Sequence, residues 1–129
     1  MDIEKIAQKA REMKVSGRYN CAQAVMIALK EETDLSEGVL MNIGAGFCAG
    51  MGTKEATCGA LIGAGIISGL KTKGQLTLKY NKELLEEFRS LCGATVCKDL
   101  KALTDGKPLC PCDMCVYNAV IAYGKILNK

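Results

Sequence analysis

Apolar residues at helical spacing are the sequence feature that most constrains this chain. Ile3, Ile6, Ala7, Ala10 and Met13 recur at intervals of three or four, as on a helix with one buried face. The spacing returns along the chain, and no segment alternates apolar and polar residues as a half-buried strand does. A chain of 129 residues has the size of one domain. We therefore predict an all-α, compact, single-domain bundle of five to seven helices over residues 1–129.

Capping and turn residues give the expected bounds of these helices. Asn20, Ser36, Thr53 and Thr95 are suitable N-caps, and Pro111 suits a first helical turn. Asp105-Gly-Lys-Pro is typical of a turn. The expected helices cover about 3–14, 21–29, a segment after Ser36 that includes 39–43, 54–70 with Glu55 in its first turn, 77–90, a short stretch up to 103, and 112–127.

Glycines gather in the middle of the chain. Eight of the 14 glycines lie between Gly44 and Gly69. We expect a tight loop over 44–52, and glycines at 59, 63, 65 and 69 inside the helix that follows. Each glycine inside a helix costs roughly 1 kcal/mol relative to alanine. The expected compensation is close approach of a cofactor or of another helix, either from this chain or from a second copy in a homodimer.

Composition excludes several functions. The chain has no histidine, so Ser-His-Asp triads, Cys-His dyads and histidine-ligated haem or zinc are excluded. It also lacks the CxxCH motif that attaches c-type haem. Its 17 basic and 14 acidic residues are interleaved without a set of stacking aromatics, which argues against nucleic-acid binding.

The expected compartment is the cytoplasm. The charged start of the chain lacks the apolar region of a signal peptide. The most apolar window, Ala56–Leu70, is too short to cross a bilayer, so we expect no membrane association. Eight cysteines in a reducing compartment indicate metal binding or redox chemistry rather than structural disulfides.

Four places with cysteine share one property, which is their position at an expected helix start. Cys21 follows Asn20, Cys58 lies about one turn beyond Thr53, Cys97 follows Thr95 by two residues, and Cys112 and Cys115 lie in the first turn after Pro111. Unpaired N–H groups and the positive end of the helix dipole stabilise thiolates at such positions. Thiolate is the form that binds metal or attacks a disulfide.

These residues also carry a resemblance. The chain resembles the redox-active protein family C_GCAxxG_C_C through its segments Asn20-Cys21-Ala-Gln-Ala-Val, Gly50-Met-Gly52, Cys58-Gly59-Ala60-Leu-Ile-Gly63, Cys97-Lys-Asp-Leu100, and Cys112 with Val116 and Ala119. The resemblance implies a small helical cytoplasmic protein of bacteria or archaea with four redox-active cysteines. The family is similar to the N-terminal part of split-Soret cytochromes c, which holds an iron–sulfur centre.

The resemblance implies a signature set of Cys21, Cys58, Cys97 and one cysteine of the last cluster. Cys112 fits the spacing to Val116 and Ala119 better, although Cys115 has small residues at the same offsets. Cys48, Cys92 and Cys110 depart from the family pattern. Cys48 and Cys92 are equally compatible with a structural role, whereas Cys110, Cys112 and Cys115 have ligand or redox spacing.

Three functions are compatible with this pattern. The first is an iron–sulfur protein for electron transfer with a redox partner protein, in which Cys21, Cys58, Cys97 and Cys112 (or Cys115) bind the cluster and the backbone of Gly50, Gly52 and Gly59 approaches it. The second is a thiol–disulfide oxidoreductase or redox sensor, with Cys21, Cys58 or Cys112 attacking and a neighbour such as Cys115 resolving. The third is a non-enzymatic helical module stabilised by zinc bound to four thiolates.

Overall fold

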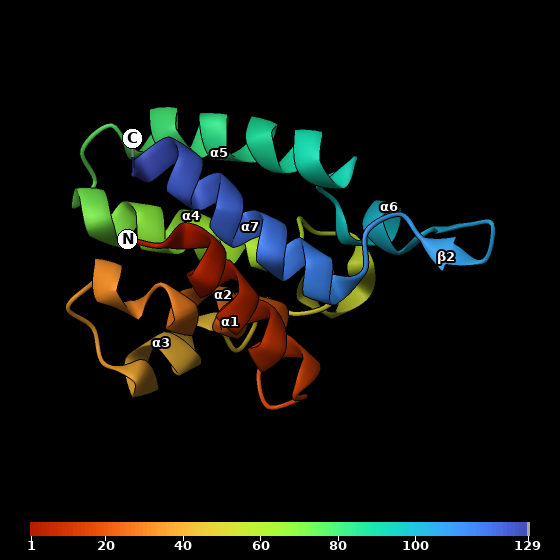
Figure 1. Ribbon diagram of the computed structural model, residues 1–129, viewed down its shortest axis with the longest axis horizontal. Helices are drawn as coiled ribbons and strands as arrows, with labels where there is room; N and C mark the ends of the chain where they lie inside the picture. The colour runs from red at the N-terminus through yellow and green to blue at the C-terminus, as the bar shows by residue number, and fades with distance from the viewer. Residues whose placement is uncertain (129) are drawn as a thin grey trace.

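The computed structural model describes residues 1–128 and is mostly helical (Figure 1). Its elements, in chain order, are α1 (Ile3–Val15), α2 (Cys21–Ala28), the 3₁₀ turn η1 (Lys30–Glu32), α3 (Glu37–Gly44), the π-type turn η2 (Gly50–Lys54), α4 (Gly59–Thr72), α5 (Thr77–Cys92), α6 (Cys97–Lys101), β1 (Leu103–Thr104), β2 (Lys107–Pro108) and α7 (Cys112–Leu127). The prediction of a mostly helical fold is confirmed. Within residues 1–128 the α-helices number seven, and η1 and η2 take the helix count above the expected range.

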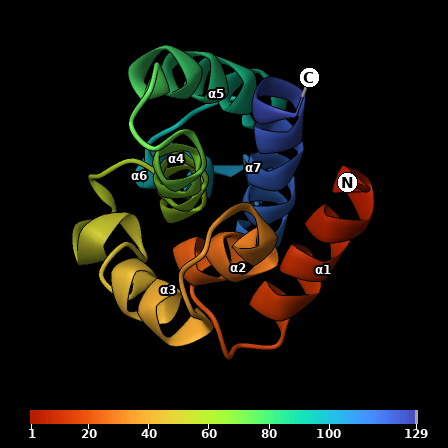
Figure 2. The same ribbon diagram turned by 90° about the vertical axis from the view of Figure 1, so that its left-hand side faces the viewer.

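Helix α4 lies at the centre of the bundle. Figure 2 shows it surrounded by α2, α5 and α7, all of which it contacts. Helix α1 packs on α7 and α2, and α3 packs on α2. The largest buried side chains, among them Tyr123, Phe88 and Met26, have no exposed surface. Leu, Ile, Val, Ala and Met supply most of the remaining core.

The glycines of α4 allow its neighbours to come close. A methyl carbon at Gly63 would lie 2.8 Å from the carbonyl oxygen of Ala22 in α2, and one at Gly59 would collide with the carbonyl oxygen of Phe47. The expected compensation by close helix approach is therefore present at Gly63, and the partner helix belongs to the same chain.

The predicted start of α4 is wrong. Thr53 does not cap this helix, because it lies inside η2, where Met51 and Gly52 have left-handed backbone angles of φ 59° and 83°. Its hydroxyl donates to the carbonyl of Gly50 (3.3 Å) and accepts from the N–H of Glu55 (3.2 Å). The helix begins at Gly59 with Cys58 as its N-cap, so Glu55 lies outside it.

The predicted helix between Thr95 and Leu103 is also partly wrong. Its N-cap is Val96 rather than Thr95, and it ends at Lys101. The following residues form a two-stranded antiparallel hairpin in which Leu103 faces Pro108. The predicted turn is confirmed, since Asp105 and Gly106 occupy it with φ of 53° and 80°, the left-handed pair of a tight hairpin.

None of the helices within residues 1–128 has the length and apolar character needed to cross a membrane.

Candidate functional site

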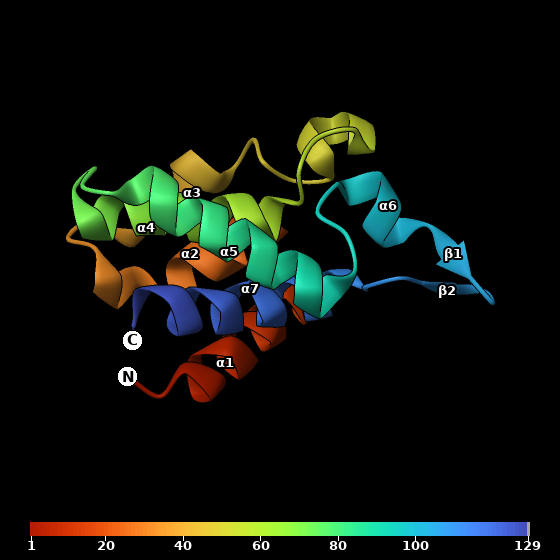
Figure 3. The same ribbon diagram turned by 90° about the horizontal axis from the view of Figure 1, so that it is seen from above.

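The cysteine-bearing helix starts meet at one end of the bundle. Cys21, Cys97 and Cys112 are the first residues of α2, α6 and α7, and Cys58 caps α4. This is the end from which the β1–β2 hairpin projects (Figures 1 and 3). The four cysteine-bearing helix starts therefore lie at the same end of the bundle.

Main-chain hydrogen bonds fix the starts of α4 and α6 against each other. The N–H of Cys58 donates to the carbonyl of Thr95 (2.8 Å), and the N–H of Cys97 donates to the carbonyl of Ala56 (3.0 Å). Thr57 and Val96 form an antiparallel bridge between these two bonds. The two cysteines are thereby held by backbone geometry.

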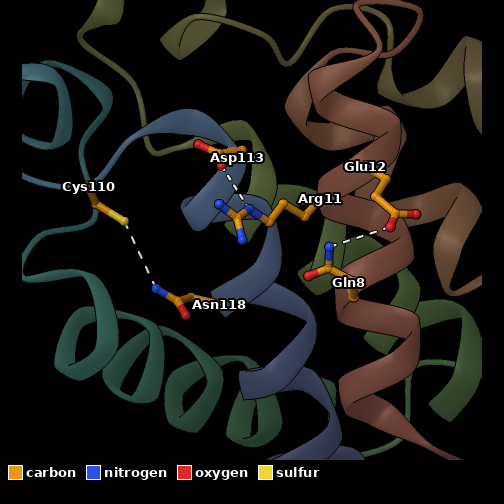
Figure 4. Close-up of polar contacts among 6 residues, drawn as sticks. All are labelled: Gln8, Arg11, Glu12, Cys110, Asp113 and Asn118. Atoms are coloured by element: carbon orange, nitrogen blue, oxygen red, sulfur yellow. Dashed lines mark hydrogen bonds and ion pairs between the residues drawn. The ribbon is translucent and has the colours of Figure 1, made fainter.

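Side chains fix the starts of α2 and α7. Asn20 and Gln23 form a capping box at α2, and the Asn20 amide also donates to the carbonyl of Gly44 (3.1 Å). At α7, Asp113 accepts from Arg11 of α1 (2.8 Å). Figure 4 shows this pair beside the start of α7.

A pocket of about 360 Å³ opens between these helix starts. Sulfur and cationic side chains dominate its lining, which comprises Cys21, Cys48, Cys97, Cys112, Lys14, Lys54, Lys101, Asn20 and Ala49. Thiols and ammonium groups together suit a ligand that binds thiolates and carries negative charge.

Cys21 and Cys112 contact each other through their side chains at this pocket. Their hydrogen bond and, to a lesser extent, the Lys101 ammonium lower the pKa of Cys112 to about 5 against the effect of burial. The same hydrogen bond and burial raise the pKa of Cys21. The pair therefore holds one thiolate, on Cys112, beside one protonated thiol.

Cys58 and Cys97 complete the predicted set. A hydrogen bond from Cys115 lowers the pKa of Cys58 to about 7, and the N–H groups of Ala60 and Leu61 act in the same direction. Burial raises the pKa of Cys97. Cys21, Cys97 and Cys112 line the pocket, whereas Cys58 does not, and its side chain contacts that of Cys115.

A second sulfur group, which we call the inner trio, consists of Cys92, Cys110 and Cys115. Their three Sγ atoms lie within 4.8 Å of one another. Their exposed fractions are 5%, 5% and 0%. The last cysteine cluster is thereby divided, because Cys112 lies at the pocket and Cys115 lies in the trio.

The side chains of Asn118 and Lys101 donate hydrogen bonds to the sulfurs of the inner trio. Asn118 donates to Sγ of Cys92 (3.4 Å) and of Cys110 (4.0 Å), and Figure 4 shows its amide directed at Cys110. The Lys101 ammonium lies 3.8 Å from Sγ of Cys115. Burial alone would lower the pKa of Lys101, but the neighbouring sulfur groups of Cys115 and Cys112 raise it. Lys101 is therefore a permanent positive charge between the pocket and the inner trio.

The three glycines expected near a cofactor occupy different surroundings. A methyl carbon at Gly50, whose φ is +58°, would lie 2.8 Å from Cβ of Cys97. Gly52 has φ +83° and nothing within 4 Å of that position. Gly59 follows Cys58 and lies against the carbonyl of Phe47. Gly50 thus lets the backbone approach Cys97, whereas Gly59 lets the start of α4 approach the backbone of Phe47.

The donor set fits a thiophilic metal centre. Seven of the eight cysteines are buried or half-buried. Cys21, Cys97 and Cys112 of these line the pocket, three form the inner trio, and the seventh is Cys58. Thiolates select zinc, copper(I) and iron–sulfur clusters among the metals of proteins.

Sequence reasoning missed Lys101, Asn118 and the grouping of Cys92 with Cys110. The signal for Cys92 was weak because it ends α5 and has no cysteine within four residues. Asn118 could have been found from its spacing, because it follows Cys115 by three residues and therefore lies on the same face of α7.

Comparison with known proteins identifies a family. The family described as "Putative redox-active protein (C_GCAxxG_C_C)" matches residues 19–126 of the chain. The match contains all eight cysteines and every helix start described above. No curated protein and no solved structure gives a significant match.

Proposed function

Since the chain belongs to the redox-active family C_GCAxxG_C_C, we propose that it transfers electrons through an iron–sulfur centre at the pocket. Cys21, Cys58, Cys97 and Cys112 are the proposed ligands. The observation that carries the proposal is the pocket itself, which joins cysteines from three helix starts with three lysines. A redox partner protein would supply or accept the electron.

Charge supports this assignment. A cluster with four thiolate ligands carries net negative charge, and its potential depends on nearby charge and on hydrogen bonds to sulfur. Lys14, Lys54 and Lys101 line the pocket and would offset that charge. The backbone near Gly50 and Gly59 would donate hydrogen bonds to the sulfur atoms, and we assign Gly52 to the same loop.

The test is anaerobic purification followed by analysis of iron and acid-labile sulfide. We expect a coloured protein with both elements in equal amounts and an absorption band that bleaches on reduction. The Cys21→Ser and Cys112→Ser variants should lose this band. The Cys48→Ser variant is the matched control, because Cys48 is exposed at the rim of the same pocket and should retain it.

A colourless product without iron after anaerobic handling and attempted reconstitution would contradict the proposal. Equal iron content in the Cys112→Ser and Cys48→Ser variants would also contradict it, because the pocket would then not hold the centre.

Thiol–disulfide exchange is a second candidate, favoured by the contact between Cys21 and Cys112. The Cys112 thiolate would attack a disulfide of a substrate protein, forming a mixed disulfide and releasing one substrate thiolate. Cys21 would then lose its proton and attack Sγ of Cys112. The products are a Cys21–Cys112 disulfide and a second substrate thiol, so two electrons pass to the substrate.

The Cys21→Ser variant separates the two candidates. If exchange is the function, this variant traps the mixed disulfide on Cys112, and a Cys21→Ser/Cys112→Ser variant traps nothing. Absence of any trapped species, with unchanged thiol counts after oxidation of metal-free protein, would refute exchange and leave the iron–sulfur proposal intact.

A further inference from the structure

The inner trio is separate from the pocket in both position and lining. None of its three cysteines lines the pocket. Cys92 comes from the end of α5, Cys110 from the segment before α7, and Cys115 from the first turn of α7. Three chain segments therefore bring one sulfur each to a closed point in the core.

From this geometry we infer that Cys92, Cys110 and Cys115 form a second site, which binds a single soft d¹⁰ metal ion, Zn²⁺ or Cu⁺. This inference goes beyond the proposed pocket centre and does not depend on it.

The spacing of the sulfurs fits a single ion. Metal–sulfur bonds of about 2.3 Å place neighbouring thiolates around one tetrahedral ion at a separation of roughly 3.8 Å. The three Sγ atoms already lie within 4.8 Å of one another, so small side-chain adjustments would close the site. In a [4Fe–4S] cluster each cysteine binds its own iron, and the cysteine sulfurs lie farther apart than around one ion.

Polar groups surround the sulfurs of the trio, and the Cys115 thiol itself donates to the carbonyl oxygen of Cys110 (3.4 Å). Three buried thiols acting only as apolar core residues would need no donors directed at them. Here the Asn118 amide donates to two of the sulfurs, at 3.4 and 4.0 Å, and the Lys101 ammonium lies 3.8 Å from the third. Hydrogen-bond donors placed around ligands are what orient and tune a metal site.

Charge balance favours a cation at this point. Three thiolates in the core would carry three negative charges, of which Lys101 offsets one. A divalent ion would neutralise the remainder, and a monovalent ion would leave one charge for the Asn118 amide dipole to stabilise. Cys58, whose side chain contacts that of Cys115, is the nearest further thiol for a four-coordinate ion.

The experiment uses a Cys21→Ser/Cys112→Ser variant, in which the pocket pair is absent. The reduced, metal-free protein is titrated anaerobically with Zn²⁺, and in a second arm with Cu⁺, against a competing chelator. We expect one equivalent of one ion to bind. Adding Cys92→Ser should weaken binding at least about 100-fold, whereas adding Cys48→Ser should leave it unchanged. Asn118→Ala should weaken it by roughly 10- to 100-fold, as loss of a supporting hydrogen bond does.

X-ray absorption of the loaded protein provides a readout that does not depend on the trio variants folding. Three or four sulfur neighbours at about 2.3 Å are expected. Binding that is equally tight with and without Cys92, or a first shell with fewer than three sulfurs, would overturn the inference. Because the pocket pair is absent from this protein, failure here leaves the iron–sulfur proposal untouched, and failure of that proposal leaves this one standing.

Discussion

The Gly63→Ala substitution tests how the packing of the bundle holds the cysteine site. The new methyl carbon would lie 2.8 Å from the carbonyl oxygen of Ala22 and 3.2 Å from its Cα. Both atoms belong to the backbone of α2, so α2 and α4 must move apart. Overpacking of this kind costs about 1–3 kcal/mol, and the helix propensity of alanine returns roughly 1 kcal/mol. We expect a net destabilisation of up to about 2 kcal/mol in the free energy of unfolding.

Gly69→Ala in the same helix is the matched control. A methyl carbon there would lie 3.7 Å from Cγ2 of Thr77, which is ordinary contact. This variant keeps the propensity gain without a clash, so it should be more stable than the parent by about 0.5–1 kcal/mol. The Tm of Gly63→Ala should lie below that of Gly69→Ala by roughly 2–12 °C, measured by circular dichroism in metal-free protein.

The same pair of variants connects packing to the site. Helices α2 and α4 carry Cys21 and Cys58 at their starts, so separating the helices displaces two proposed ligands. Iron content after anaerobic reconstitution should fall in Gly63→Ala and stay unchanged in Gly69→Ala. If Gly63→Ala melts at or above the temperature of Gly69→Ala, close approach of α2 is not the reason for glycine at position 63, and the packing account is refuted.

Three further predictions concern the site itself. Gly50→Ala should lower iron content more than Gly52→Ala. Both positions have positive φ, but only a methyl carbon at Gly50 would lie 2.8 Å from Cβ of Cys97. Equal losses of iron in the two variants would show that backbone strain alone is responsible. Alkylation of Cys112 in metal-free protein should decline only as pH falls through about 5, whereas a free cysteine thiol loses its thiolate below about 8.5; a midpoint near 8.5 by mass spectrometry would contradict the lowered pKa. Lys101→Met should move the Cys112 midpoint upward, since the ammonium favours the thiolate, and an unchanged midpoint would exclude this role of the charge.

Most of the helices, and the cysteine-bearing starts of α2 and α7, could be predicted because each depends on local sequence. Apolar spacing and the Asn20 cap place α2 without reference to the rest of the chain, and Pro111 does the same for α7. The start of α4 could not be placed in this way. Thr53 has the chemistry of an N-cap, but left-handed residues at 51 and 52 and pairing of Thr57 with Val96 delay the helix until Gly59. That pairing joins segments about forty residues apart, and the spacing of apolar residues along the chain does not predict contacts over such a distance.

The division of the cysteines into two groups is equally non-local. Cys110, Cys112 and Cys115 lie within six residues, and their spacing alone indicates one ligand cluster. The start of α7 separates them, because Cys112 faces Cys21 at the pocket whereas Cys110 and Cys115 lie against Cys92 in the core. The hairpin before Cys110 and the end of α5 bring Cys110 and Cys92 together. No local sequence pattern predicts that these two segments meet.

Lys101 links the two groups electrostatically. Its ammonium lies 3.8 Å from Sγ of Cys115 and also stabilises the thiolate of Cys112. One positive charge is thus shared between the pocket and the inner trio. Only thiolates bind metal, so binding of a cation at the trio would release the protons of Cys92 and Cys115, whose pKa values are raised by hydrogen bonds and burial. Three thiolates around a divalent ion carry one net negative charge, the same as a metal-free trio in which Cys110 alone is ionised. Loading the inner trio should therefore leave the reduction potential of a centre bound by Cys112 nearly unchanged, because the net charge beside the pocket does not change.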